Sequence, residues 1–322
     1  MIRSIRNLSA EEKQKFQASN LFQLICREHT FQRLSLQYYA EYFGKDYVDH
    51  SLLIYNQEEP VLCVFAFTNN DTLRFFDSPI KLIYHPLTPV NTINEAFRTL
   101  FQNFEENLQK QGINHILFHS DPYFNRYYFD SIQETKVSHQ CFVDLKLKDE
   151  NIRMNLRKSY KSLINWGAKN LTLKTINNTN PELQEFLKFK DLHLTVAGRA
   201  TRTHESWMLQ FEQIVHNQGF LITGYSHDKL VSGTLVLHGS ENAYYGVGAY
   251  DRNLMSQKLA ISHYPLFYSI LHAKSIGLKK YFLGTIDMLD PTDNKLNEIN
   301  NFKKGFTATL AQEIASTVSL SD

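Results

Sequence analysis

The chain contains the same order of sequence patterns twice, and this repeat restricts the possible folds more than any other feature. Each half has three runs rich in β-branched and aromatic residues, then an amphipathic helical run, then a fourth strand-like run. In the first half these runs cover 51–57, 61–68, 71–76, 93–112 and 113–120; in the second they cover 219–226, 230–239, 242–250, 256–277 and 278–285. We therefore predict an α+β fold with mixed sheets, built from two domains related by duplication and covering 1–150 and 151–322.

The composition excludes several classes of protein. The 322 residues are 43% hydrophobic and 21% charged, as in globular domains, and a net charge of +1 gives no global attraction to nucleic acid or membranes. The longest apolar run, 61–67, is far shorter than the roughly 20 residues of a membrane helix, and the N-terminus lacks the apolar core of a signal peptide. Because the three cysteines are also widely spaced, we expect a soluble, cytoplasmic protein without an integral membrane segment.

Positive charge is concentrated in one part of the chain. The stretch 151–181 contains no acidic residue and six basic ones, namely Arg153, Arg157, Lys158, Lys161, Lys169 and Lys174. Arg199 and Arg202 follow in a loop-like stretch. Such a set can bind phosphate groups, and guanidinium groups do so with two hydrogen bonds. The alternative for the lysines is a solvated helix face.

The strand predicted at 242–250, NAYYGVGAY, contains two glycines within the strand. Gly246 and Gly248 indicate a β-bulge or a close approach of another group to the backbone. The alternative is that they simply make room for an aromatic neighbour. Tyr244 and Tyr245 must point to opposite faces of the strand, so only one of them can line a cleft.

The thirteen histidines do not form a metal-binding pattern. His115 and His119 are four residues apart, but they lie in a predicted strand without a third ligand nearby. No HExxH, GxSxG or P-loop motif occurs, so zinc hydrolase, serine hydrolase and NTPase activities have no support. We expect no metal and no permanently bound cofactor.

Four segments together resemble the Fem family, the non-ribosomal peptidyltransferases that build peptidoglycan cross-bridges. They lie at 155–170 (NLRKSYKSLINWGAKN), 193–210, 220–252 and 300–306 (NNFKKGF). The resemblance is strongest over about 151–310; in 1–150 only the element order supports it. It implies two tandem domains of the GNAT acyltransferase fold. It also implies transfer of an aminoacyl group from aminoacyl-tRNA, or of an acyl group from coenzyme A, to an amine.

The resemblance and the chemistry of acyl transfer together suggest roles for particular residues. In this fold, backbone N–H groups where the fourth strand parts from the fifth stabilise the oxyanion, and here that strand is 242–250. The expected catalytic residues are Lys303, Tyr245 and Asp287, with His263 as another candidate for a general base. The expected substrate-binding residues are Arg199, Arg202, Trp207, Gly246, Gly248, Phe302, Arg157 and Lys158. For Lys303 the alternative is a surface lysine on the last strand.

The donor and the acceptor remain open at this stage. The glycine-containing loop that holds the pyrophosphate of coenzyme A has no counterpart in 251–260, although Arg252 could still meet a phosphate. This favours the ester of an aminoacyl-tRNA, with the tRNA acceptor end and a nucleotide- or lipid-linked cell-envelope precursor as partners. The alternatives are an acyl-coenzyme A-dependent enzyme that acylates an amino sugar, and a degenerate relative that only binds ligands.

Overall fold

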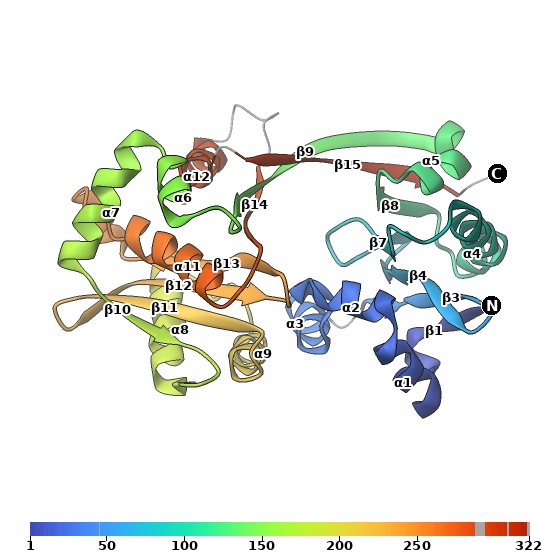
Figure 1. The fold of residues 1–322 in the computed structure, drawn as a ribbon, viewed down its shortest axis with the longest axis horizontal. Coiled ribbons are helices and arrows are strands. Elements are labelled where there is room, and N and C mark those ends of the chain that lie inside the picture. Colours follow the sequence, from blue (N-terminus) through green and yellow to red (C-terminus); the bar gives the residue numbers. More distant parts are fainter. Residues whose placement is uncertain (45, 287–293, 308, 321–322) are drawn as a thin grey trace. The chain divides into compact units, whose positions relative to one another are not determined.

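The computed structural model describes residues 1–44, 46–286, 294–307 and 309–320, which form two compact units (Figure 1). Unit 1 consists of Met1–Cys26, Phe43–Ser138 and Gln312–Asp322, and unit 2 consists of Arg27–Tyr42 and His139–Ala311. The predicted domains 1–150 and 151–322 rest on the repeated order of elements. The two units are defined by compactness, which is a different criterion and does not test that order. That division therefore stays a prediction.

Unit 1 is built around one long helix, α4 (Val90–Lys110), whose Phe97, Leu100 and Phe104 enter the core. An antiparallel sheet has the order β1 (Ile2–Ser4), β3 (Leu52–Asn56), β4 (Glu59–Phe65) and β7 (Lys81–Tyr84). A second set has the order β15 (Leu310–Ser319), β8 (His115–His119), β6 (Thr72–Arg74), β5 (Phe67–Asn69) and β2 (Val48–Asp49). The other helices of this unit are α1 (Ala10–Ala18), α2 (Asn20–Cys26) and α5 (Pro122–Tyr128).

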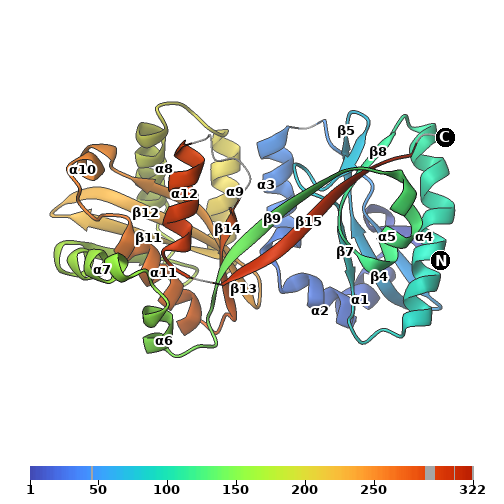
Figure 2. The same cartoon turned by 90° about the horizontal axis from the view of Figure 1, so that it is seen from above.

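Unit 2 is a mixed sheet covered by helices on both faces (Figures 1 and 2). Its strand order is β10 (Thr172–Ile176), β11 (Gly219–Ser226), β12 (Lys229–His238), β13 (Asn242–Tyr250), β14 (Lys280–Ile286) and the end of β9 (Ile132–Asp144). Neighbouring strands are antiparallel except β13 and β14, which are parallel. One face carries α6 (Asp149–Met154), α7 (Lys158–Asn170) and α11 (His263–Ser275), and the other carries α8 (Leu183–Ala197) and α9 (His204–Val215). The remaining helices are α3 (Arg33–Phe43), α10 (Arg252–Ser256) and α12 (Asn294–Lys304).

The predicted α+β fold with a duplicated element order is confirmed. Unit 2 contains β11, β12, β13, α11 and β14 in that order, and unit 1 contains β3, β4, β7, α4 and β8. The strand predicted at 71–76 is present as β6, but it does not belong to the sheet of β3 and β4. The third strand beside β4 is β7, whereas 72–74 form β6, which pairs with β5 and β8. Strand β6 ends before Phe76, because Phe76 adopts a φ of 51°, which an extended strand does not allow.

The helical run predicted at 256–277 is shorter in the structure. Helix α11 begins only at His263, and of 256–262 only Ser256 is helical, at the end of α10. Pro265 lies in the first turn of α11. The N–H groups of a first turn have no partner within the helix, so a proline, which has no N–H, costs no hydrogen bond there. The basic stretch 151–170 belongs to two helices, α6 and α7.

A close contact between β12 and α8 tests this packing. An alanine at Gly233 would place its Cβ 2.2 Å from Cδ2 of Phe189, whose ring is fully buried. We expect Gly233→Ala to lower the free energy of unfolding by about 1–3 kcal/mol, because a well-packed core does not absorb an extra methyl group. Urea denaturation would measure this loss.

Gly246→Ala is the matched control on the adjacent strand. Its Cβ would lie 3.4 Å from the nearest heavy atom, so the change in stability should stay below about 0.5 kcal/mol. Equal stability of the two variants would contradict the packing described for α8.

Candidate active site

β13 and β14 part shortly after they begin to pair, and this fork is the centre of the candidate site. Within the described chain they pair at three positions, Asn242 with Lys280, Ala243 with Tyr281 and Tyr244 with Phe282. After Tyr244, β13 continues alongside β12, and β14 continues alongside β9. The inner edge of β13 therefore offers backbone N–H groups to a ligand from Tyr245 onward.

Both strands contain an irregularity at the level where they part. The register of β13 against β12 shifts between Tyr245 and Val247, leaving Gly246 as the extra residue, so the predicted bulge is confirmed. The register of β14 against β9 shifts between Phe282 and Gly284. Because a bulge bends its strand, the two shifts open the fork from both sides. The sequence analysis missed Gly284, which adopts a φ of 96°. The available signal was a glycine inside the strand predicted at 278–285.

Lys303 lies against the parted half of β14. Its Nζ donates a hydrogen bond to the carbonyl oxygen of Thr285 at 2.9 Å, and a Cβ at Gly284 would lie 3.2 Å from the same nitrogen. Burial lowers the pKa of Lys303 from its ordinary value. Lys303 belongs to the last turn of α12, not to the last strand as the alternative interpretation assumed. Its catalytic role stays a prediction.

The start of α7 holds the end of α12 in place. Arg157 donates from Nη2 to the carbonyl oxygen of Asn301 at 3.0 Å, and the hydroxyl of Tyr160 donates to the carbonyl oxygen of Phe302 at 3.2 Å. Phe302 is half-buried, and its ring lies 5.5 Å from that of His263. The structure thus brings Arg157, Phe302 and Lys303 together. The sequence analysis missed Tyr160, although it stands within the quoted segment 155–170.

Tyr245 points into the face of the sheet covered by α7 and α11. Its hydroxyl lies 3.1 Å from that of Tyr250, which lies 3.2 Å from Oγ1 of Thr234. An alanine at Gly248 would clash with the Tyr245 hydroxyl, so this glycine makes room for the phenol. Burial raises the pKa of Tyr245 well above its ordinary value, and the phenol therefore keeps its proton at neutral pH.

The structure describes only one of the two predicted catalytic bases. Asp287 lies outside the described residues. His263 begins α11, and burial, helped by the nearby charge of Arg157, lowers its pKa to about 4. The imidazole is therefore neutral at pH 7, but it is a weak base.

The two predicted arginines have different surroundings. Arg199 is exposed, whereas Arg202 donates from Nη1 to the hydroxyl of Tyr38 and to Oε1 of Gln210, both at 3.0 Å. The Arg202 guanidinium also lies 4.6 Å from the ring centroid of Trp207. Trp207 is only 4% exposed and packs in the core with Phe186 and Phe189 of α8. The ligand-binding roles of these residues stay predictions, as does that of the exposed Lys158.

The connection from β13 to α11 differs from a phosphate-binding loop. Asp251 caps α10 by accepting hydrogen bonds from the N–H groups of Asn253 and Leu254. Its carboxylate also accepts a hydrogen bond from Lys229 at 2.7 Å. Arg252, a candidate phosphate ligand, donates from Nε to the carbonyl oxygen of Val196 at 2.9 Å. A carboxylate therefore stands where a pyrophosphate would need free donors.

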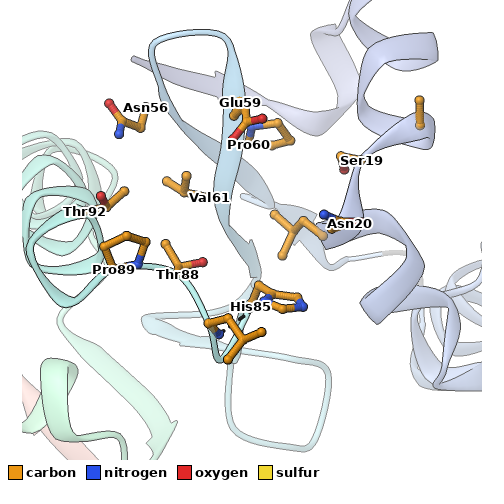
Figure 3. Close-up of a pocket in the computed structure, with 13 residues that line it drawn as sticks. Ser19, Asn20, Asn56, Glu59, Pro60, Val61, His85, Thr88, Pro89 and Thr92 are labelled. Carbon is orange, nitrogen blue, oxygen red and sulfur yellow. Dashed lines mark hydrogen bonds between the residues drawn. The ribbon is translucent and has the colours of Figure 1, made fainter.

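A pocket of about 510 Å³ lies in unit 1, between the α1–α2 junction, the β3–β4 turn and the start of α4 (Figure 3). Its ionisable lining groups are Glu59 and His85, and the predicted site residues do not line it. Elsewhere in the described residues, no group of three His, Cys, Asp or Glu side chains could hold a metal ion. None of the described helices is both long and apolar enough to cross a bilayer.

Comparison with protein-family models and with curated proteins gives no match. Solved structures do match. FemX aligns with a TM-score of 0.64 at 10% identity, over 95% of this chain and 96% of that one. The C-terminal domain of an Agrobacterium fabrum protein assigned as a lysylphosphatidylglycerol synthetase aligns with a TM-score of 0.59 at 12% identity, over 97% of this chain and 93% of that one. A tandem GNAT protein of clavulanic acid biosynthesis aligns with a TM-score of 0.51 at 13% identity, over 86% of this chain and 84% of that one. The chain has a tandem GNAT fold, similar to that of FemX.

The contrast between the arginines predicts a difference in stability. Arg202→Gln removes two hydrogen bonds, one of them to Gln210, which is only 2% exposed. Leaving that buried acceptor unpaired should cost about 1–3 kcal/mol of unfolding free energy. Arg199→Gln changes an exposed side chain and should cost less than about 0.5 kcal/mol. Thermal and urea unfolding of both variants would test this, and an equal cost would show that the contacts of Arg202 add nothing to the fold.

Proposed function

We propose that the protein transfers an aminoacyl or acyl group to an amine, with the donor carbonyl bound in the fork between β13 and β14. The amine nitrogen attacks the carbonyl carbon, and the carbonyl oxygen takes up negative charge. When the tetrahedral intermediate collapses, the new C–N bond remains. The bond to the donor oxygen or sulfur breaks, and the leaving group receives a proton.

One observation carries this proposal: Lys303 stands on the half of β14 that has parted from β13. Backbone N–H groups and an ammonium group are both fixed donors of a kind that stabilises a developing oxyanion. Lys303 offers one N–H to Thr285, and an ammonium has three, so donors remain for a substrate. Burial strengthens the interaction, because the effective dielectric constant falls inside the protein.

The positions of the positive charges favour the ester of an aminoacyl-tRNA as donor. In acyl-coenzyme A a long pantetheine arm separates the thioester from the pyrophosphate, whereas the terminal nucleoside of tRNA carries ester and phosphate on the same ribose. Arg157 contacts Asn301, two residues before Lys303, and Lys158 follows it. These cations suit a phosphate close to the reacting carbonyl. The region suited to a distant pyrophosphate contains Asp251 instead.

For the acceptor, we propose an amine of a nucleotide- or lipid-linked cell-envelope precursor. The support is the fold shared with FemX and the exposed guanidinium of Arg199, which can reach an anionic group. The test is a single-turnover assay with labelled aminoacyl-tRNA or labelled acetyl-coenzyme A and a nucleotide-linked muropeptide. Transfer from the tRNA ester alone supports the proposal. Transfer from coenzyme A alone would identify the protein as an acyl-coenzyme A-dependent enzyme, and ligand binding without transfer would identify a degenerate relative.

The role of Lys303 gives a direct prediction. Lys303→Ala should lower single-turnover transfer by about 100-fold, the usual cost of losing one oxyanion-stabilising donor. Lys304→Ala is the matched control, because it removes the adjacent lysine of the same helix turn and should keep the parent rate. Melting curves must show that both variants fold. A normally folded Lys303→Ala protein that transfers at the parent rate would remove Lys303 from the mechanism.

The pH dependence gives a second prediction. The transfer rate should fall as pH rises through the lowered pKa of Lys303, at a lower pH than for an ordinary lysine, because the ammonium then loses its charge. Titration of Lys303 changes the stability of the fold in the opposite direction. The unfolded chain binds this proton more tightly, so stability increases with pH over the same range. Unfolding through Lys303 therefore cannot explain the loss.

The pH profile of Lys303→Arg provides the comparison. Arginine stays charged at high pH, so the descending limb should move upward in this variant while Lys304→Ala keeps the parent profile. A descending limb that is identical in all three proteins would assign it to another group.

A further inference from the structure

Residues 27–42 belong to unit 2, although the chain on both sides of them belongs to unit 1. This segment begins against the start of β13. The carbonyl oxygen of Arg27 accepts hydrogen bonds from the N–H of Asn242 at 3.2 Å and of Glu241 at 3.4 Å. A Cβ at Gly239 would lie 2.2 Å from that carbonyl oxygen. The backbones approach so closely that Gly239 has no room for a side chain.

Glu28 binds β13 through both of its carboxylate oxygens. Nδ2 of Asn242 donates to Oε1 at 2.5 Å, and the hydroxyl of Tyr244 donates to Oε2. These two donors are separated by one residue, so they stand on the same face of the strand. Both belong to the short stretch in which β13 still pairs with β14.

Tyr244 carries the contact across to β14. It forms the last register pair of the fork with Phe282, and the two rings stack at 4.9 Å between centroids with an interplanar angle of 12°. The ring of His29 lies 4.5 Å from that of Tyr244. Glu28 therefore fixes the residue immediately before the strands part.

We infer that Glu28 is a positioning residue for acyl transfer: by holding Tyr244 it determines where the N–H groups of Tyr245–Val247 stand in the fork. This inference rests on the proposed function. Misplacement of catalytic groups by about 1 Å can cost up to 100-fold in rate, even when the change is far from the reacting atoms. A residue that acts in this way changes kcat more than it changes the KM for the donor.

The test compares Glu28→Ala, Glu28→Gln and Glu41→Ala in the full-length protein. Glu41 is the matched control, because it lies in the same segment and accepts one hydrogen bond from Oγ1 of Thr203, away from the fork. Glu28→Gln keeps an oxygen acceptor for Asn242 and a polar group for Tyr244. The measurements are kcat and KM for aminoacyl-tRNA, the melting temperature, and hydrogen exchange of the peptide covering 242–250.

We expect Glu28→Ala to lower kcat by about 10- to 100-fold with little change in KM, and to speed amide exchange in 242–250. Glu28→Gln should restore most of kcat, and Glu41→Ala should match the parent in both measurements. An unchanged kcat in Glu28→Ala would overturn the inference. The inference would also be overturned if Glu41→Ala lost kcat to the same extent for the same drop in melting temperature. The segment would then act only through the stability of the fold.

Failure of the proposed function gives a different result. If the parent protein transfers no group from any donor, the assignment of the activity is wrong, whereas hydrogen exchange still reports on the fork. Parent-like exchange in Glu28→Ala would then show that Glu28 does not fix β13. Faster exchange confined to 242–250 would support its positioning of the strand.

Discussion

The parting of β13 and β14 is the constraint on which the rest of unit 2 depends. Parallel neighbours normally exchange main-chain hydrogen bonds along their length, and an unpaired N–H inside a protein costs free energy unless another group accepts from it. Here main-chain hydrogen bonds are lost only along the two edges that face each other, because β13 stays paired with β12 and β14 stays paired with β9. A carbonyl oxygen placed in the fork would satisfy donors that the fold itself leaves open.

The helices around the fork show how a distant lysine is fixed on it. A Cβ at Gly305 would lie 2.0 Å from Cε2 of Tyr160, so α7 and the end of α12 meet in direct contact. The backbone N–H of Arg157 also donates to the carbonyl oxygen of Gly305 at 2.9 Å. These contacts act on the main chain next to Lys303. They fix the main chain from which the Lys303 side chain reaches Thr285.

Local patterns predicted the parts of this arrangement that local sequence determines. The strands 219–226 and 242–250 are correct to the residue, because β-branched and aromatic runs end at polar boundaries, and a glycine within the second strand indicated its bulge. The helix of Lys303 was missed because 294–304 is dominated by polar residues and contains only three apolar ones, Leu296, Ile299 and Phe302. Helix α9 was missed because its start resembles a loop; Thr203 in fact caps it by accepting from the N–H of Ser206. The contact of Glu28 with Tyr244 spans 216 residues, and no local pattern encodes such a pair.

Three separate parts of the chain thus contribute different properties to one fork. In the proposed reaction, the end of α12 supplies charge through Lys303, β13 supplies backbone donors around Gly246, and the segment that begins at Arg27 supplies alignment through Glu28. Charge depends on pH, whereas alignment depends on packing and hydrogen bonds. Substitutions that change the charge should therefore move the pH profile. Substitutions that disturb the alignment should lower the rate at every pH. Under the proposed function, donors that are fixed before the substrate arrives need little reorganisation when charge develops on the carbonyl oxygen. This is the condition under which such groups stabilise a transition state most strongly.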